Sequence, residues 1–420
     1  MKLDTKAMRY LTPEDWRVLT AVEMGSKNHE VVPTPLISQI AGLRSGSGVH
    51  KCISNLAKTN LIARVKNAKY DGYRLTYGGL DYLALHTHLK RSTLYSTGNQ
   101  IGTGKESDIF AVSTSTGTQH VLKIHRLGRI SFRTVKTNRD YLRNNRSSSG
   151  SWMYMSRLAA MKEYAFLTAL WENGFAVPKP IAQSRHTIVM ELIDAFPLRQ
   201  VDSVPNPAEL YAELIAIILR LAKFGLIHGD FNEFNILIKE TPPSSPTHTT
   251  DSTPSITPIL IDFPQMLSID HANAEMYFDR DVQCIKRFFE RRFHFVSSEP
   301  GPSFAHARRQ VGKDARRKTD GTTKRLDVEV EATGFSRKMA KDLEKYMKAV
   351  GVDGDRNGTD RRGEDEESGK SGHDEDASED EGTDGAGSGS DGEDDGGDTN
   401  SQKRESDVPS ILNLTIGEKT

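Results

Sequence analysis

An aspartate and an asparagine lie five residues apart in the segment HGDFNEFNILI, residues 228–238. Phosphoryl transfer requires one carboxylate that faces the acceptor, and hard oxygen ligands that hold Mg²⁺ between phosphate oxygens. In the spacing H-x-D-x-x-x-x-N, Asp230 can be the base or orienting carboxylate and Asn235 a metal ligand. Asp262, which ends the apolar segment PILIDF, can be the second metal ligand. Each residue alone is also compatible with an ordinary turn or cap.

A lysine in the otherwise apolar segment HVLKIH needs an anionic partner, either nucleotide phosphates or a carboxylate. This lysine is Lys123. The segment SRLAAMKEYAFLTALWENG predicts a helix with Glu163 on its inner margin as the carboxylate partner, and Glu172 at its end is the alternative. The residues expected to face the core are Leu158, Met161, Ala165 and Leu167.

The segment GTGKESDIF, residues 102–110, lacks the residues of a Walker A loop because Asn99 and Glu106 occupy two defining positions. It fits the kinase pattern G-x-G-x-x-G-x-V, with Ser107 in place of the third glycine and Ile109 in place of the valine. A plain β-turn is the alternative. The residues predicted to contact the phosphates are Gly102, Gly104, Lys105, Glu106 and Ser107.

The segment HTIVMELIDAFPL, residues 186–198, predicts a strand that leaves the smaller lobe, and its alternative is an ordinary buried strand. Purine contacts are predicted from Met190, Glu191 and Ile193. Two differences from ordinary protein kinases follow: Gly229 replaces the arginine of the catalytic loop, and Pro264 replaces the glycine after Asp-Phe. No A-P-E follows, and residues 265–293 predict two helices without a platform for a peptide.

Three helices followed by a hairpin are predicted in the first 92 residues, which is typical of a winged helix. Thr12 is the predicted N-cap before Pro13. The third helix, residues 46–60, carries a buried stripe of Val49, Cys52, Ile53 and Leu56. Basic residues lie where nucleic-acid-binding winged helices carry them, although a solvated charged face is the alternative: Arg44, Lys51, Lys58, Arg64, Lys66, Lys69 and Arg74.

The remaining segments predict loops and one helix. Residues 127–152 lack periodicity and predict a mobile loop, and residues 241–257 are a low-complexity insertion between two strands. Residues 308–325 predict a basic linker and residues 334–350 an amphipathic helix. Residues 351–400 hold 19 acidic and 4 basic residues, which leaves +14 on the rest of the chain. A basic body with an acidic tail predicts a polyanionic partner, RNA first.

Two cysteines 232 positions apart match no metal spacing, and no apolar signal sequence or membrane segment is present, so we expect a reducing compartment and no membrane anchor.

The chain resembles the Rio-type atypical protein kinases, specifically their second subfamily. The resemblance rests on the order of five features: the glycine-rich loop, Lys123, Glu163, HGDFNEFN and IDFPQ. The resemblance spans about residues 1 to 350. It implies an α+β chain in which a winged helix precedes a bilobal kinase-like domain with a truncated C-lobe, followed by a disordered acidic tail.

The resemblance also implies ATP and Mg²⁺ as cofactors, a phosphoaspartate at Asp262, and limited serine autophosphorylation. It further implies a monomer that acts in the cytoplasm, shuttles through the nucleus, and matures the small ribosomal subunit precursor with its rRNA, ribosomal proteins and other assembly factors. The predicted domains are 1–92 (winged helix), 97–300 (kinase, with lobes at about 97–190 and 191–300), 301–350 (linker and helix) and 351–420 (tail).

Three other functions fit parts of the pattern. The first is a serine/threonine kinase that phosphorylates ribosome-assembly partners in trans. A small-molecule phosphotransferase also uses H-G-D-x-x-x-x-N, but this class explains neither the winged helix nor the tail. A scaffold that only binds nucleotide is disfavoured because Lys123, Asp230, Asn235 and Asp262 are all present.

Overall fold

The computed structural model describes residues 3–65, 71–127, 152–241, 255–316, 325–333, 335 and 337–350. All of the described residues belong to one compact unit. The predicted mobile loop lies almost entirely outside the described residues, as do positions 242–254 of the insertion and the whole acidic tail. Lys66 and Lys69 also lie outside them.

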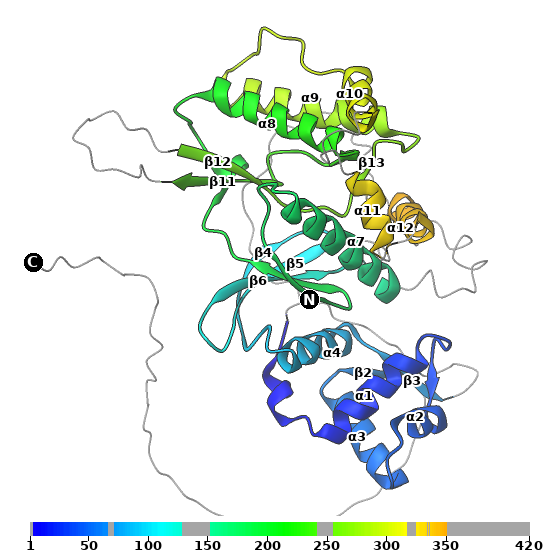
Figure 1. Ribbon diagram of the computed structural model, residues 1–420. Coiled ribbons are helices and arrows are strands. Elements are labelled where there is room, and N and C mark those ends of the chain that lie inside the picture. Colours follow the sequence, from blue (N-terminus) through cyan, green and yellow to red (C-terminus); the bar gives the residue numbers. More distant parts are fainter. Residues whose placement is uncertain are drawn as a thin grey trace, which may run out of the picture. The chain divides into compact units, whose positions relative to one another are not determined.

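The first part of the chain is a winged helix, as predicted (Figure 1). The side chain of Thr12 accepts a hydrogen bond from the Asp15 amide while the Asp15 carboxylate accepts one from the Thr12 amide, so the N-cap prediction is confirmed. The apolar stripe of the third helix is buried. Its elements are η1 (Lys6–Tyr10), α1 (Pro13–Gly25), β1 (Val32–Pro33), α2 (Thr34–Ala41), α3 (Gly46–Lys58), β2 (Ile62–Val65), β3 (Gly72–Leu75) and α4 (Tyr77–Lys90).

Helix α4 was not predicted, because it is buried on more than one side and therefore lacks the one-sided apolar pattern of a surface helix. Leu80, Tyr82 and Leu83 belong to the winged-helix core, whereas Leu85 packs with residues of the following sheet. The helix thus contributes apolar side chains to two separate cores, one in the winged helix and one against the following sheet.

The smaller lobe is a five-stranded antiparallel sheet in the order β4-β5-β6-β8-β7, accompanied by one long helix (Figure 1). In its register, Lys123 of β6 lies between Ile109 of β5 and Ile188 of β8. The lysine is therefore held on a central strand. The elements are β4 (Ser96–Thr103), β5 (Ser107–Ser113), β6 (Gln119–His125), α7 (Trp152–Glu172), β7 (Pro180–Ser184) and β8 (Thr187–Glu191).

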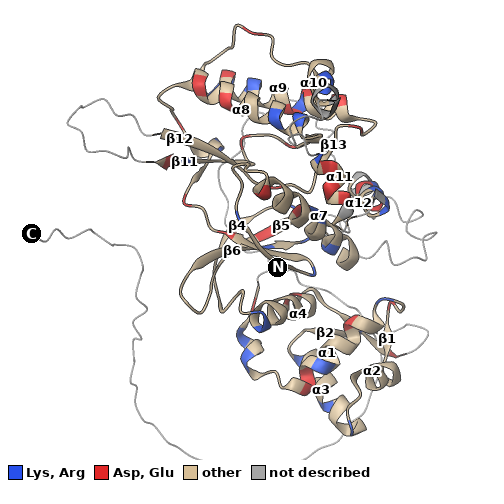
Figure 2. Cartoon of the chain, viewed as in Figure 1, with Lys and Arg blue, Asp and Glu red and all other residues tan. Residues whose placement is uncertain are grey.

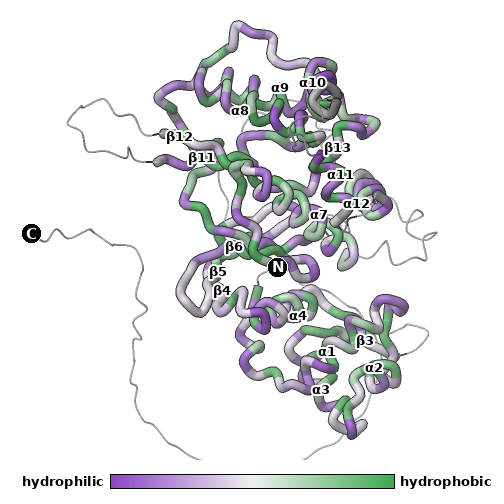
Figure 3. The backbone as a smooth tube through the Cα atoms, viewed as in Figure 1, coloured by the Kyte–Doolittle hydropathy of each residue, from purple (hydrophilic) through white to green (hydrophobic). Residues whose placement is uncertain are grey.

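The larger lobe is mainly helical and contains two small sheets, β12-β11-β9 and β10-β13. Along α8 and α9 the hydropathy alternates between hydrophobic and hydrophilic, as expected for helices with one buried face (Figure 3). The elements are β9 (Phe196–Pro197), η3 (Leu198–Gln200), α8 (Pro207–Lys223), β10 (Leu226–Ile227), β11 (Ile236–Thr241), β12 (Ser255–Leu260), β13 (Leu267–Ser268), α9 (Ala274–Phe293), α10 (Phe304–Arg316), α11 (Leu326–Ala332) and α12 (Arg337–Val350).

Three predictions for the larger lobe were wrong. Residues 265–293 form the short strand β13 and a single helix, because strand pairing with β10 holds Leu267 and Ser268. Residues 308–316, predicted as linker, belong to helix α10, whose apolar residues Phe304, Ala307 and Val311 join the core. The ends of the 241–257 insertion belong to the β11–β12 ladder. Among the described residues, no helix is long and apolar enough to cross a membrane.

Candidate active site

Lys123 joins two acidic residues from distant parts of the chain. Its Nζ lies 2.7 Å from Glu163 Oε1 and 2.8 Å from Asp262 Oδ1. Glu163 is buried on α7, and its second oxygen lies 2.9 Å from Nε2 of His125. The predicted Lys123–Glu163 pair is therefore present, and the alternative partner, Glu172, is exposed at the end of the helix.

Burial shifts the pKa values of Glu163 and Lys123 in opposite directions. It raises the pKa of Glu163, but Lys123 and His125 lower it more, to about 2. Burial also lowers the pKa of Lys123, yet Asp262 and Glu163 raise it above its ordinary value. Both groups are thus charged at neutral pH, and the ammonium group is fixed beside Asp262.

The catalytic-loop segment HGDFNEFN fixes Asp230 through two amides. Asn235 donates from Nδ2 to Asp230 Oδ2 over 3.0 Å, and Asn232 donates to Asp230 Oδ1 over 2.9 Å. His228, the first residue of the motif, is buried edge-on against Phe231 and Phe263, and burial lowers its pKa to about 4. The neutral histidine therefore packs the loop against the core and leaves the chemistry to the other side chains.

Asp281 of α9 positions the same loop, although the sequence analysis did not identify it. Its carboxylate accepts hydrogen bonds from the amides of Gly229, at 2.9 Å, and Phe231, at 3.0 Å. Gly229 has φ +78°, and a Cβ there would lie 2.8 Å from the Gln265 carbonyl oxygen. The backbone geometry at Gly229 therefore favours glycine, in the position where ordinary kinases carry arginine.

The predicted phosphate loop is a tight turn between β4 and β5. Its amide at Gly104 donates to the Ser107 carbonyl over 2.8 Å, whereas Gly102 pairs with Ile109 and Lys105 is exposed. Burial, followed by the charge of Asp262, raises the pKa of Glu106 to about 8. Glu106 thus belongs electrostatically to the same site as Asp262 and Asp230.

A second unpredicted feature links the phosphate loop to the winged helix. Arg126, which is 2% exposed, donates to both carboxylate oxygens of Asp81 on α4 at 2.7 Å. Its Nε donates to Asp108 on β5 over 3.2 Å, and its backbone amide donates to the Glu106 carbonyl. His186 also lies within 2.8 Å of Asp81. No spacing in the sequence signals this bridge, because its members lie 18 to 105 positions apart.

The predicted purine segment lies at the end of β8. Met190 is buried, and the Glu191 amide donates to the Lys179 carbonyl over 3.0 Å, so this amide is not free for a purine. Ile193 follows in the half-exposed connection toward β9. Purine recognition by this segment remains a prediction.

The acidic character of the site fits a divalent cation. Burial and then the charge of Asp262 raise the pKa of Asp230, as they do that of Glu106, because these carboxyl groups repel one another. Among the described residues, no group of three or more His, Cys, Asp or Glu side chains is arranged to hold a metal alone. Mg²⁺ often relies on one or two carboxylates plus substrate phosphates, so Asn235 and Asp262 with a bound nucleotide fit this ion.

Comparisons with known proteins agree with this geometry. The family model described as "Rio2, N-terminal" matches residues 8–91, and the "RIO domain" model matches residues 108–300. The chain is 52% identical over 346 residues to serine/threonine-protein kinase rio2 of Schizosaccharomyces pombe, covering 82% of this chain and 92% of that protein. It is 50% identical to serine/threonine-protein kinase RIO2 of Saccharomyces cerevisiae, covering 80% of this chain and 78% of that protein.

A solved structure extends the similarity to three dimensions. The crystal structure of the Rio2 kinase-ADP/Mg²⁺-phosphoaspartate complex from Chaetomium thermophilum is 68% identical and matches with a TM-score of 0.74, covering 84% of this chain and 99% of that one. The identities and the coverage show the family as well as the fold. This chain therefore belongs to the Rio2 group of RIO-type serine/threonine-protein kinases.

Proposed function

We propose that this kinase is an ATP-driven assembly factor that acts in late maturation of the small ribosomal subunit and turns over ATP through a phosphoaspartate at Asp262. The observation that carries the enzymatic part is the gathering of Lys123, Glu163 and Asp262 within hydrogen-bonding distance. The Chaetomium protein, 68% identical, contains ADP, Mg²⁺ and a phosphoaspartate in its crystal structure, which supports the same chemistry here.

The proposed reaction needs few groups. An Asp262 carboxylate oxygen forms a bond to the γ-phosphorus of ATP while the bond to the β–γ bridging oxygen breaks and ADP leaves. Lys123 neutralises phosphate charge from the central strand. Mg²⁺, held by Asn235 and Asp262, supplies further charge neutralisation when bound. Water then cleaves the acyl phosphate and releases inorganic phosphate, so the net reaction is ATP hydrolysis.

Asp230 has a separate role in this proposal. Its raised pKa and its two amide donors suit a group that orients and deprotonates an acceptor, either the water or a serine hydroxyl. Limited serine autophosphorylation then uses Asp230, whereas nucleotide hydrolysis uses both aspartates.

The winged helix supplies a surface for rRNA in this proposal. Arg44, Lys51 and Lys58 are exposed on α3 or just before it, where no ion pair holds them within the described chain. Arg64 and Arg74, in contrast, pair with Asp71 at 2.9 Å and with Glu30 at 3.8 Å. The exposed cations of α3 are therefore the better candidates for phosphate contacts.

The phosphoaspartate can be tested directly. Purified protein incubated with labelled ATP and Mg²⁺ should acquire a phosphate that hydroxylamine removes. This phosphate should also be lost in acid, under conditions in which phosphoserine is stable. Asp262→Ala should abolish this label, and Asp230→Ala should reduce turnover. A label that persists in Asp262→Ala would refute the phosphoaspartate step.

The assembly role needs its own measurement. Cells whose only copy carries Asp262→Ala should accumulate small-subunit precursor with the variant protein bound to it. In cells with the wild-type gene, the protein should be released from the precursor. Normal precursor processing in those cells would count against the role. Phosphoserine formed on a partner protein over many turnovers without any label on Asp262 would instead favour a kinase that acts only in trans.

A further inference from the structure

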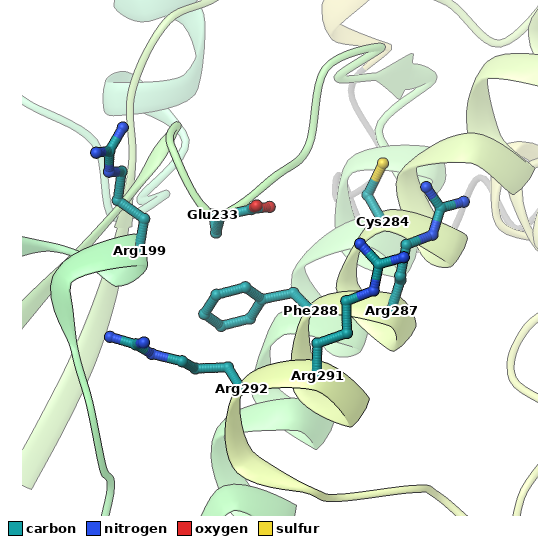
Figure 4. A pocket seen from close by; sticks show the side chains of 7 residues that line it. All are labelled: Arg199, Glu233, Cys284, Arg287, Phe288, Arg291 and Arg292. Carbon is teal, nitrogen blue, oxygen red and sulfur yellow. The ribbon is translucent and has the colours of Figure 1, made fainter. Parts of the chain in front are cut away.

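A cavity rich in arginine lies beside the catalytic loop. It has a volume of about 470 Å³ and is lined by four arginines against one acidic residue, Glu233 (Figure 4). Glu233 lies between Asp230 and Asn235 in the sequence, so the cavity adjoins the loop that carries the proposed base. Nothing in the proposed hydrolysis of ATP uses these arginines.

The cations come from two separate parts of the larger lobe. Arg287 and Arg291 lie one helical turn apart on α9, and Arg199 lies across the cavity on η3 (Figure 4). Several positive residues along α9 are visible in Figure 2. Like charges four residues apart on a helix repel one another, and a bound anion would offset this repulsion.

The partners of these arginines differ. Arg292 donates to the Val201 carbonyl over 3.0 Å and pairs with Asp202, which accounts for it structurally. Within the described residues, Arg287 and Arg291 have neither a hydrogen bond nor an ion pair, and both are exposed. The helix C-terminus favours a cation at Arg291, but it does not explain Arg287, which lies further from that end.

The chemistry of the cavity excludes some ligands. Burial and then the charge of Asp281 raise the pKa of Cys284, so its thiol is protonated and suits neither covalent chemistry nor a soft metal. Among the described residues that line the cavity, Phe288 is the one aromatic residue, and it packs against Phe289 and Phe293. The exposed ring of Phe234 lies outside the lining, with the Arg199 guanidinium 4.9 Å from its centre. Single-stranded RNA commonly stacks successive bases on several open rings, so this lining suits it less well than a phosphate group.

We propose that this cavity binds a phosphorylated serine or threonine of a protein segment whose acceptor hydroxyl reaches Asp230. Guanidinium groups form paired hydrogen bonds with phosphate oxygens, and arginine clusters are a recurring means of recognising phosphorylated segments. The excess positive charge of the cavity matches a phosphate dianion. A substrate already phosphorylated close to the acceptor is therefore preferred. This inference rests on the serine/threonine kinase activity and adds a specificity to it.

The test uses the full-length chain and a positional peptide library. Each peptide carries one acceptor serine and a phosphoserine at one flanking position, and the matched peptides carry serine, glutamate or alanine there. Labelled ATP measures transfer to the acceptor, and fluorescence polarisation measures binding. At the preferred position we expect phosphoserine to improve binding at least tenfold over serine, with glutamate intermediate.

Variants locate the effect. Arg287→Ala with Arg291→Ala should remove the phosphoserine preference, with a loss of roughly tenfold for each guanidinium group. Arg287→Lys with Arg291→Lys should keep part of it, because an ammonium group attracts the phosphate without the paired geometry. Arg309→Ala, an exposed arginine on α10 outside the cavity, should behave as wild type. The melting temperature of each variant should equal that of the wild type, so that differences in peptide binding do not reflect misfolding.

Three results would overturn the proposal. The first is equal binding of serine and phosphoserine peptides. The second is a phosphoserine preference that survives the double alanine variant. The third is a single-stranded RNA oligomer that binds in this cavity and that the phosphopeptide does not displace. Labelling of Asp262 is measured in parallel, in the wild type and in the double variant, to separate this site from ATP turnover. If Asp262 is labelled but the wild type shows no preference for phosphoserine, the phosphoserine site is refuted and the phosphoaspartate step is not.

Discussion

The buried bridge between Asp81 and Arg126 gives a quantitative test of how the winged helix supports the kinase domain. Asp81 is 2% exposed and accepts from both terminal nitrogens of Arg126 at 2.7 Å, with His186 at 2.8 Å. Removing one member of a buried ion pair costs about 3–5 kcal/mol. Asp108 remains near Arg126 Nε, so we expect Asp81→Asn to lower the free energy of unfolding by about 3 kcal/mol, the lower end of that range.

A matched control exists in the pair that Arg185 forms with Glu23, which joins the same two domains. This pair also has two short contacts, at 2.6 and 2.8 Å, but its side chains are 20% and 19% exposed. Glu23→Gln should therefore cost about 1 kcal/mol or less, because solvent screens the charges. Urea unfolding followed by tryptophan fluorescence can measure both variants, since Trp16 lies in the winged helix and Trp171 in α7.

The same variants should differ in nucleotide affinity. Arg126 contacts Asp108 and the Glu106 carbonyl, so loss of the bridge should loosen the phosphate loop and weaken Mg-ATP binding severalfold, whereas Glu23→Gln should leave it unchanged. A cost for Asp81→Asn no larger than that for Glu23→Gln would contradict the reasoning.

Three further predictions concern the catalytic loop and the phosphate loop. Gly229→Ala should destabilise the protein by about 2 kcal/mol or more, because it adds positive-φ strain and a contact at 2.8 Å with the Gln265 carbonyl oxygen. The control Gly117→Ala has the same strain in open space and should cost about 1 kcal/mol. Thermal unfolding measures both variants. Asp281→Asn should lower the rate of Asp262 labelling at least tenfold, because the amide oxygen of asparagine replaces only one of the two carboxylate acceptors. Circular dichroism should show that the variant stays folded. An unchanged labelling rate would contradict the positioning role of Asp281. Burial and the charge of Asp262 raise the pKa of Glu106 from 4.5 to about 8. The contribution of this group to the free energy of unfolding is therefore fully present below about pH 4.5 and is lost as the pH rises through 8. Glu106→Gln should remove this pH dependence in urea unfolding measured across the same range.

Local sequence patterns were sufficient for much of the fold. The cap at Thr12 and the stripe of α3 depend on residues three or four positions apart, and both are as predicted. The loop HGDFNEFN carries its own geometry, since Asn232 and Asn235 bond Asp230 within a few residues. In the larger lobe local patterns misled where tertiary contacts compete with them: strand pairing formed β13, and a buried apolar face turned part of a basic stretch into α10.

By itself, the sequence determined which chemical groups form the candidate site, because their residue types and order are those that phosphoryl transfer requires. The tertiary structure alone decided the groups that hold them in place. Asp281 below the catalytic loop, the Asp81–Arg126 bridge and the arginine cavity all depend on side chains that are distant in the chain and meet only after folding. Local spacing cannot signal such contacts, since burial and proximity, which set their energies, are properties of the folded chain.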